Sequence, residues 1–215
     1  MIDEPVFVLN TDIDWASEHC IKTLLETADE YAIKPTAYVT HESAVLKDYA
    51  QRGKATLGLH PNFLPDSSHG ADRDAVIAHV YGLVPDAVCF RSHCMVDDTH
   101  ISMAMKQRGI LYDSNLCLYL QPGMVPLHHW TGIPRFPMFW ADDIHWRRGG
   151  SWNFADYEEV FFTPGLKIVS THPFMFTLNL ADHQTYTKLK SHIPSLSAEQ
   201  AKAMRHTGKG TATLQ

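Results

Sequence analysis

Short apolar runs, each followed by polar residues, recur along the first half of the chain and once more near its end. Val6 to Leu9 is an unbroken apolar run, which is typical of a parallel strand buried on both faces. Similar runs predict further strands over 35–39, 56–59, 87–90 and 165–170.

The segments between these runs have the spacing of amphipathic helices. After Ser17, apolar residues recur on one helical face at Ile21, Leu24, Leu25, Ala28 and Tyr31. Further helices are expected over about 43–51 and 72–81, and from Asp97 or Asp98 to Gly109. Because strands alternate with helices, the pattern predicts an α/β fold with a mostly parallel sheet. Whether that sheet closes into a barrel is left open by the pattern.

The later part of the chain is less regular. Prolines and glycines interrupt residues 112–135 repeatedly, so no element is placed there. A helix is expected over 198–204, followed by a Gly- and Thr-rich tail, 206–215, that is expected to be loose. The length of 215 residues then predicts a single domain over 1–205 with a flexible tail.

Composition narrows the class of protein. Hydrophobic residues make up 45% and charged residues 20% of the chain, as in globular proteins, and a net charge of −6 disfavours nucleic acid and anionic membranes as partners. No apolar run approaches the roughly 20 residues of a membrane span, so no membrane insertion and a cytoplasmic location are expected. The four cysteines form no CxxC pair and are expected to be reduced.

Ionisable residues stand where the predicted strands end. They are Asp12 and Asp14, His60, Arg91 and His93, and His172. In a barrel or a curved parallel sheet such ends meet on one face, where their side chains would form an active site. The 14 histidines also raise the expectation of a metal ion. Asp12 and Asp14 have an alternative interpretation as the N-cap and first-turn acid of the following helix.

With these motifs in view, the chain resembles the polysaccharide deacetylase superfamily, carbohydrate esterase family 4, and within it short, divergent members associated with surface-polysaccharide biosynthesis. The resemblance runs from about Val6 to Asn179. It implies an irregular, incomplete (β/α)7-type barrel. It also implies a hydrolase that removes an N-acetyl or O-acetyl group from a saccharide with one divalent metal ion, often Zn²⁺.

The first two family motifs assign the metal site by resemblance. Thr11-Asp12-Ile13-Asp14 is similar to the acidic pair of the first motif, which makes Asp12 the general base and Asp14 a metal ligand. His60 matches the first histidine of the second motif, but the position four residues later is Leu64. The missing ligand is therefore expected to be His69, with His93 as the alternative, unless the ligand set is reduced.

The remaining motifs supply the other candidate residues. Arg91 resembles the arginine that holds the base, and His172 resembles the histidine that acts as general acid. Asp142 or Asp143, in an acid and tryptophan region, would support the imidazolium of His172. Three further residues are candidates for substrate binding: Trp140, Asn62 and Phe174. For Trp140 and Phe174, a place in the core is an equally good interpretation.

Two other functions remain open at this point. The same ligands could serve a metal-dependent hydrolase of another amide or of a phosphoester, although few basic residues lie near the motifs. The departure at Leu64 also allows a carbohydrate-binding relative without turnover. A serine esterase is disfavoured because no GxSxG motif is present. The sugar, the choice between N-acetyl and O-acetyl, and the oligomeric state are not predicted.

Overall fold

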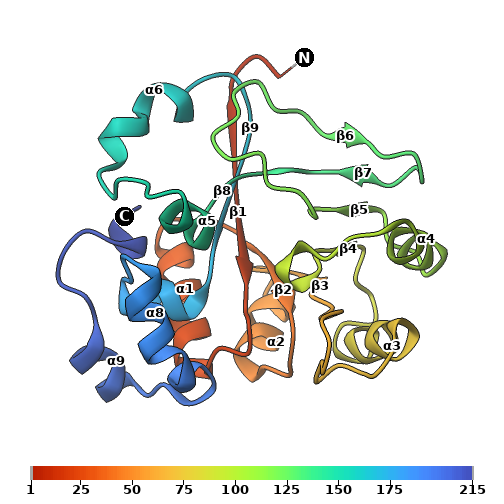
Figure 1. Ribbon diagram of the computed structural model, residues 1–215, viewed down its shortest axis with the longest axis horizontal. Coiled ribbons are helices and arrows are strands. Elements are labelled where there is room, and N and C mark those ends of the chain that lie inside the picture. Colours follow the sequence, from red (N-terminus) through yellow and green to blue (C-terminus); the bar gives the residue numbers. More distant parts are fainter. Residues whose placement is uncertain (1, 215) are drawn as a thin grey trace.

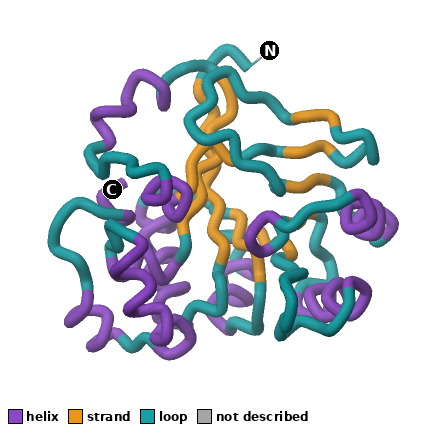
Figure 2. The backbone as a smooth tube through the Cα atoms, viewed as in Figure 1, coloured by secondary structure: helices purple, strands orange, loops and turns teal. Residues whose placement is uncertain are grey.

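The fold is built on one curled sheet of nine strands, seen in a computed structural model that describes residues 2–214. The strand order is β6-β7-β5-β4-β3-β2-β1-β9-β8, and within the described chain only the β6–β7 pair is antiparallel. The sheet curls into a half-barrel with helices around it (Figures 1 and 2), which confirms the expected incomplete barrel. The strands are β1 (Pro5–Asp12), β2 (Thr36–Val39), β3 (Thr56–Leu59), β4 (Cys89–Phe90), β5 (Tyr112–Asp113), β6 (Leu127–His128), β7 (Pro134–Arg135), β8 (Met138–Ala141) and β9 (Gly165–Thr171).

The first four helices each begin directly after a polar residue whose side chain caps the helix. Ser17, Ser43, Asp72 and Asp98 each accept a hydrogen bond from a backbone N–H in the first turn of α1, α2, α3 and α4. The helices are α1 (Glu18–Glu30), α2 (Ala44–Gln51), α3 (Arg73–Leu83), α4 (Thr99–Gln107), α5 (Asp142–Arg147), α6 (Glu158–Phe161), α7 (Pro173–Leu178), α8 (His183–Leu189) and α9 (Ala198–Met204). Short 3-10 turns are η1 (His93–Met95), η2 (Phe154–Tyr157), η3 (Lys190–Ser195) and η4 (Thr211–Leu214).

The position of β1 decides where the functional residues lie. It lies between β2 and β9 in the sheet and pairs in parallel with both strands. Its pairing with β9 runs from Pro5–Gly165 to Thr11–Thr171. Because β1, β2, β3, β4 and β9 are parallel, their carboxyl ends lie along one edge of the sheet (Figure 1).

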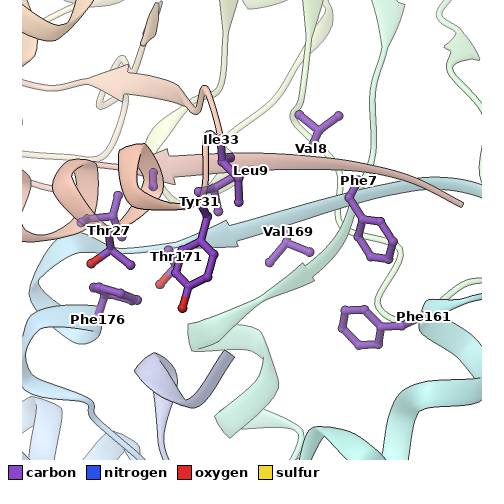
Figure 3. A pocket seen from close by; sticks show the side chains of 12 residues that line it. Phe7, Val8, Leu9, Thr27, Tyr31, Ile33, Phe161, Val169, Thr171 and Phe176 are labelled. Carbon is purple, nitrogen blue, oxygen red and sulfur yellow. The ribbon is translucent and has the colours of Figure 1, made fainter. Parts of the chain in front are cut away.

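The first half of β1 is less buried than its apolar run predicts. Val6 is 45% and Phe7 50% exposed. Phe7 and Phe161 lie at one end of an open apolar groove of about 430 Å³, while Tyr31 and Phe176 lie toward its other end (Figure 3). Tyr31, predicted to lie on the buried face of the first helix, follows α1 and is 60% exposed.

The C-terminal tail is partly docked, in contrast to the loose segment expected from its composition. Residues 206–209 are exposed, but Gly210, Thr211 and Ala212 are buried. The Thr211 hydroxyl donates to the Leu180 carbonyl at 2.7 Å, and the Ala212 N–H donates to Asn179 Oδ1 at 2.9 Å. Sequence composition missed this contact because Asn179, which receives the tail, is distant from it along the chain.

Within residues 2–214, the helices are all too short or too polar to cross a bilayer.

Candidate active site

The strand ends bring the predicted acids and histidines into one small cavity of about 70 Å³. Asp12 is the last residue of β1, and the backbone then leaves the extended conformation, with positive φ angles of 37° at Asp14 and 56° at Trp15. This turn carries the Asp14 carboxylate toward the ends of β3 and β4. The lining residues are Asp12, Asp14, His60, Ser92, His93, Cys94, Met95, Met138, Ala141, Asp143, Ile144 and His172.

Asp14, His60 and His93 form a group that could hold a metal ion. Asp14 Oδ1 lies 3.1 Å from His60 Nε2 and 3.2 Å from His93 Nδ1. One ligand atom from each of the three residues lies within 4.8 Å of the others. Two imidazole nitrogens and one carboxylate oxygen are a common donor set for zinc, and they leave a coordination position open.

Hydrogen bonding around His60 fits a bound cation. His60 Nδ1 lies 2.6 Å from the Arg91 carbonyl, so this nitrogen carries the proton and donates it there. The lone pair of Nε2 then faces the Asp14 carboxylate, which is also an acceptor, and a cation between the two resolves that conflict. A ligating histidine that donates its other N–H to a backbone carbonyl is the usual arrangement in metal sites.

The charges of this group point the same way. Burial would raise the pKa of Asp14, but the neighbouring imidazoles of His60, His93 and His172 together outweigh it and bring that pKa well below its usual range. Burial would lower the pKa of His93, but hydrogen bonds to Asp14 and Cys94 and the charge of Asp14 together raise it to about 10. The carboxylate therefore stays ionised and draws positive charge toward itself, as a cation site requires.

His69, the favoured third ligand, lies outside this group. Its Nε2 donates to the Thr40 carbonyl at 2.9 Å, and its Nδ1 accepts the Asn62 N–H at 3.1 Å. Both ring nitrogens are therefore used to fix the loop after β3. Burial lowers the pKa of His69 to about 4. The structure thus places the expected ligand, His69, outside the group and the alternative, His93, beside Asp14.

Asp12 is held by Arg91, as the resemblance implies. Arg91 Nη1 donates to Asp12 Oδ1 at 2.8 Å, and the rest of the guanidinium is fixed by Ser114 and Ser170 and stacks over Tyr38. Burial alone would raise the pKa of Asp12, but the charges of Arg91, His60 and His172 together outweigh this effect and lower that pKa. Asp12 is therefore ionised at neutral pH and can accept a proton.

His172 is hydrogen-bonded to Asp142, and a carboxylate oxygen of Asp143 lies within 4.8 Å of both residues' ligand atoms. Asp142 accepts hydrogen bonds from His172 Nδ1 at 2.7 Å, from the His172 N–H at 2.8 Å and from the Thr171 hydroxyl at 2.9 Å. Burial would lower the pKa of His172, but the charge and hydrogen bond of Asp142 raise it well above its usual value. The Asp143 carboxylate lies 3.9 Å from the Arg147 guanidinium, and burial raises its pKa.

The predicted substrate-binding residues are not on the cavity wall. Trp140 is fully buried, and its Nε1–H donates to His145 Nδ1 at 2.9 Å; Phe174 is 2% exposed and belongs to the core. Asn62 Oδ1 accepts the Leu64 N–H at 3.1 Å and so stabilises the loop after β3. The core interpretation is the correct one for the two aromatic residues, because β8 and α7 direct their side chains inward.

Sequence reasoning missed His145 and Ser92. His145 is fully buried in an aromatic cluster, where its Nδ1 accepts from Trp140 and from the Tyr119 hydroxyl and its Nε2 donates to the Ser151 carbonyl. Ser92 lies on the cavity wall between Arg91 and His93. Its neighbours in the sequence were the only signal that could have identified it.

Comparison with known proteins agrees with this geometry. The model of one protein family, described as WbmS-like polysaccharide deacetylase, matches residues 9–190. The chain belongs to this polysaccharide deacetylase family. The matched range contains every residue of the cavity wall. The sequence-based recognition of the superfamily is therefore confirmed.

Solved structures show the same fold. A Bordetella bronchiseptica protein, provisionally described as a polysaccharide deacetylase involved in O-antigen biosynthesis, is 24% identical, with a TM-score of 0.87 over 97% of this chain and 87% of that chain. A Mycobacterium smegmatis protein provisionally described as a polysaccharide deacetylase is 15% identical, with a TM-score of 0.54 over 93% of this chain and 89% of that one.

A more distant likeness extends to another carbohydrate-active fold. The 4-alpha-glucanotransferase from Thermococcus litoralis is 10% identical, with a TM-score of 0.56 over 92% of this chain and 38% of that chain. Among curated protein sequences, none matches the chain. The deacetylase fold is thus supported by family and structure, while the roles of individual residues rest on the site geometry.

Proposed function

We propose that the protein is a metal-dependent deacetylase that removes an N-acetyl group from a sugar unit of a surface polysaccharide or its precursor. The observation that carries this proposal is the convergence of a cation-binding group, an ionised acid and a protonated histidine around one cavity. Family membership supplies the substrate class. The O-antigen role described for the Bordetella bronchiseptica protein favours a surface saccharide.

The cation would be held by Asp14, His60 and His93. A bound divalent ion such as Zn²⁺ polarises an acyl carbonyl and lowers the pKa of a water molecule toward about 7. Asp12, kept ionised by Arg91, accepts the proton of the attacking water. His172, kept protonated by Asp142, donates its Nε2 proton to the sugar nitrogen as it leaves.

The charges around the cavity argue against a phosphoester substrate. Arg91 forms an ion pair with Asp12, the proposed base. The remaining N–H groups of its guanidinium already donate hydrogen bonds within the protein, so they are not free to bind a substrate. Arg147 is 66% exposed and lies beside Asp143. A phosphate group needs free cationic donors, whereas an uncharged acetyl group does not.

The function is tested by acetate release from N-acetylated oligosaccharides and sugar nucleotides, with and without a chelator. We expect release that stops when the metal is removed and returns with Zn²⁺. Asp12→Asn should abolish turnover and keep the metal, whereas Asp14→Ala should lose both. Full activity of Asp12→Asn would refute the assignment of the base. Hydrolysis confined to a phosphoester panel would refute the deacetylase function.

A further inference from the structure

The Ser92 hydroxyl is a buried group at the site that has no role in the mechanism proposed above. Ser92 is fully buried, it lines the same cavity as Asp12 and His172, and its Oγ has no hydrogen-bond partner in the described chain. Buried hydroxyls are seldom left unpaired, because losing water without a replacement hydrogen bond costs free energy. An unpaired hydroxyl in a catalytic cavity therefore indicates a ligand group.

Two other buried hydroxyls of the described residues, those of Thr11 and Thr177, also lack a partner, but neither residue lines the cavity. The other buried serines are all paired: Ser43 donates to Glu18, Ser102 donates to Asp97, Ser114 donates to the Phe136 carbonyl, and Ser170 accepts from Arg91. Ser92 differs from them in its position on the cavity wall. Among the unpaired buried hydroxyls of residues 2–214, that of Ser92 is the one that belongs to the cavity wall.

The backbone around Ser92 is fixed on every side. The Ser92 N–H donates to Asn115 Oδ1 at 2.7 Å, and the Ser92 carbonyl accepts the Met95 N–H at 2.8 Å. The flanking Arg91 and His93 N–H groups donate to the carbonyls of Leu59 and Pro61 at 3.0 and 2.9 Å. The backbone that carries the hydroxyl is therefore fixed before any ligand arrives, which favours a preorganised donor.

The charges of the cavity decide what the hydroxyl does. Asp12, Asp14 and Asp143 place carboxylates on the wall, so acceptors are abundant there. Free donors are few, because Arg91 and His60 Nδ1 are engaged within the protein and the Nε2 proton of His172 is assigned to the leaving nitrogen. The hydroxyl proton of Ser92 is free, and the acyl oxygen of an acetyl group is an acceptor that gains negative charge during hydrolysis.

We propose that Ser92 Oγ donates a hydrogen bond to the acyl oxygen of the substrate and holds it as charge develops there. The inference rests on the proposed function and adds a catalytic residue to it. No bond to Ser92 forms or breaks: Asp12 takes the proton of water, His172 gives a proton to the leaving nitrogen, and Ser92 stays a hydroxyl throughout. The acyl group is thereby fixed between His172 and the end of β4.

The test compares Ser92→Ala with Ser102→Ala. Ser102 is equally buried, lies in α4 and contacts Asp97 rather than the cavity. Ser92→Ala should lower kcat by about 100-fold with a smaller change in KM. Its melting temperature and metal content should stay at the wild-type values, because the lost group has no partner in the fold. Ser102→Ala should show the reverse, a lower melting temperature with unchanged kcat.

A second measurement does not depend on turnover. Acetate, the expected product, offers the same kind of oxygen, and its binding to the Zn²⁺-loaded protein can be measured by calorimetry. We expect Ser92→Ala to bind acetate at least about tenfold more weakly than wild type. Wild-type acetate affinity in Ser92→Ala, or a kcat within about threefold of wild type, would overturn the inference. If wild type releases no acetate but the affinities differ, the proposed function fails and the assignment of Ser92 stands.

Discussion

The histidines around Asp14 show what sequence can and cannot assign at the level of single residues. His60 and His172 follow strands directly, so their place at the site could be predicted from the end of each strand. The choice between His69 and His93 could not, because it depends on which ring nitrogens the backbone occupies. His69 gives both nitrogens to the loop after β3, whereas His93 Nδ1 faces Asp14.

This difference predicts distinct metal affinities for two histidine variants. His93→Ala should reduce Zn²⁺ content to a small fraction of one ion per chain and remove the rise in melting temperature that Zn²⁺ produces, because it deletes one of three ligands. His69→Ala should keep the metal and lose only stability of the loop. Elemental analysis and thermal unfolding with and without Zn²⁺ measure both. A full metal load in His93→Ala together with an empty His69→Ala would reverse the assignment.

The buried His145 is expected to make the stability of the folded protein depend on pH. Burial lowers its pKa below the ordinary value of 6.5, and the opposing charge of Asp142 and the hydrogen bond to the Ser151 carbonyl do not restore it. It is packed against the rings of Trp140, Trp152 and Phe154 and the Tyr119 hydroxyl, whose pKa burial raises to about 12. The folded protein therefore holds His145 neutral, and the stability that this contributes is present above pH 6.5 and lost as the pH falls.

His145→Gln should isolate that contribution. At pH 7.5 the variant should be about 1–3 kcal/mol less stable than wild type, because Gln cannot keep all three hydrogen bonds. The gap should shrink as the pH is lowered toward about 5, since only wild type must lose a proton from His145 to fold. Urea unfolding of both proteins in chelator across this pH range gives the difference. A gap that is independent of pH would contradict it.

At the level of elements, apolar runs and helix caps were sufficient to place most strands and helices along the chain. They did not predict which faces of those elements are buried in the fold. Ser17, Ser43, Asp72 and Asp98 cap helices where the pattern predicted helix starts. The exposed half of β1 could not be predicted, because a buried and an open strand face carry the same apolar residues. The docking of the tail onto Asn179 depends on a long-range contact, which local composition does not encode.

Two glycine variants test whether the tail is an integral element. A Cβ at Gly210 would lie 2.3 Å from the Asn179 carbonyl oxygen, so Gly210→Ala should displace the tail and cost about 1–3 kcal/mol of stability. Gly82→Ala is the control: Gly82 is an exposed residue of α3 with nothing within 4 Å of a built Cβ. This control should gain about 0.5–1 kcal/mol from helix propensity. Equal effects of the two substitutions would argue against a docked tail.

For the molecule as a whole, the alternation of strands and helices predicted a parallel sheet, and the resemblance supplied its incomplete closure. Neither gave the strand order at the two edges. The region 112–135, left without elements, forms β5 and the β6–β7 hairpin, whose strands are two residues long each. Such short strands carry too little pattern to be recognised, because a period of two needs several residues to be visible.

The same architecture predicts uneven protection of the backbone. β1 is hydrogen-bonded on both sides, to β2 and β9, whereas β6 is an exposed edge strand paired with β7 alone. Amide hydrogens of β1 and β9 should therefore exchange slowest and together, and those of β6 and β7 should exchange fastest among the strands. Hydrogen exchange followed by mass spectrometry measures this order. Faster exchange in β1 than in β6 would contradict it.

The pairing of β1 with β9 also has a consequence for synthesis on the ribosome. Asp12, Asp14, His60 and His93 all precede Gly165, the first residue of β9, along the chain. In the function proposed above, a nascent chain stopped before Gly165 would carry the three proposed cation ligands without His172, the proposed proton donor. Turnover would therefore wait until β9 has been made and has paired with β1.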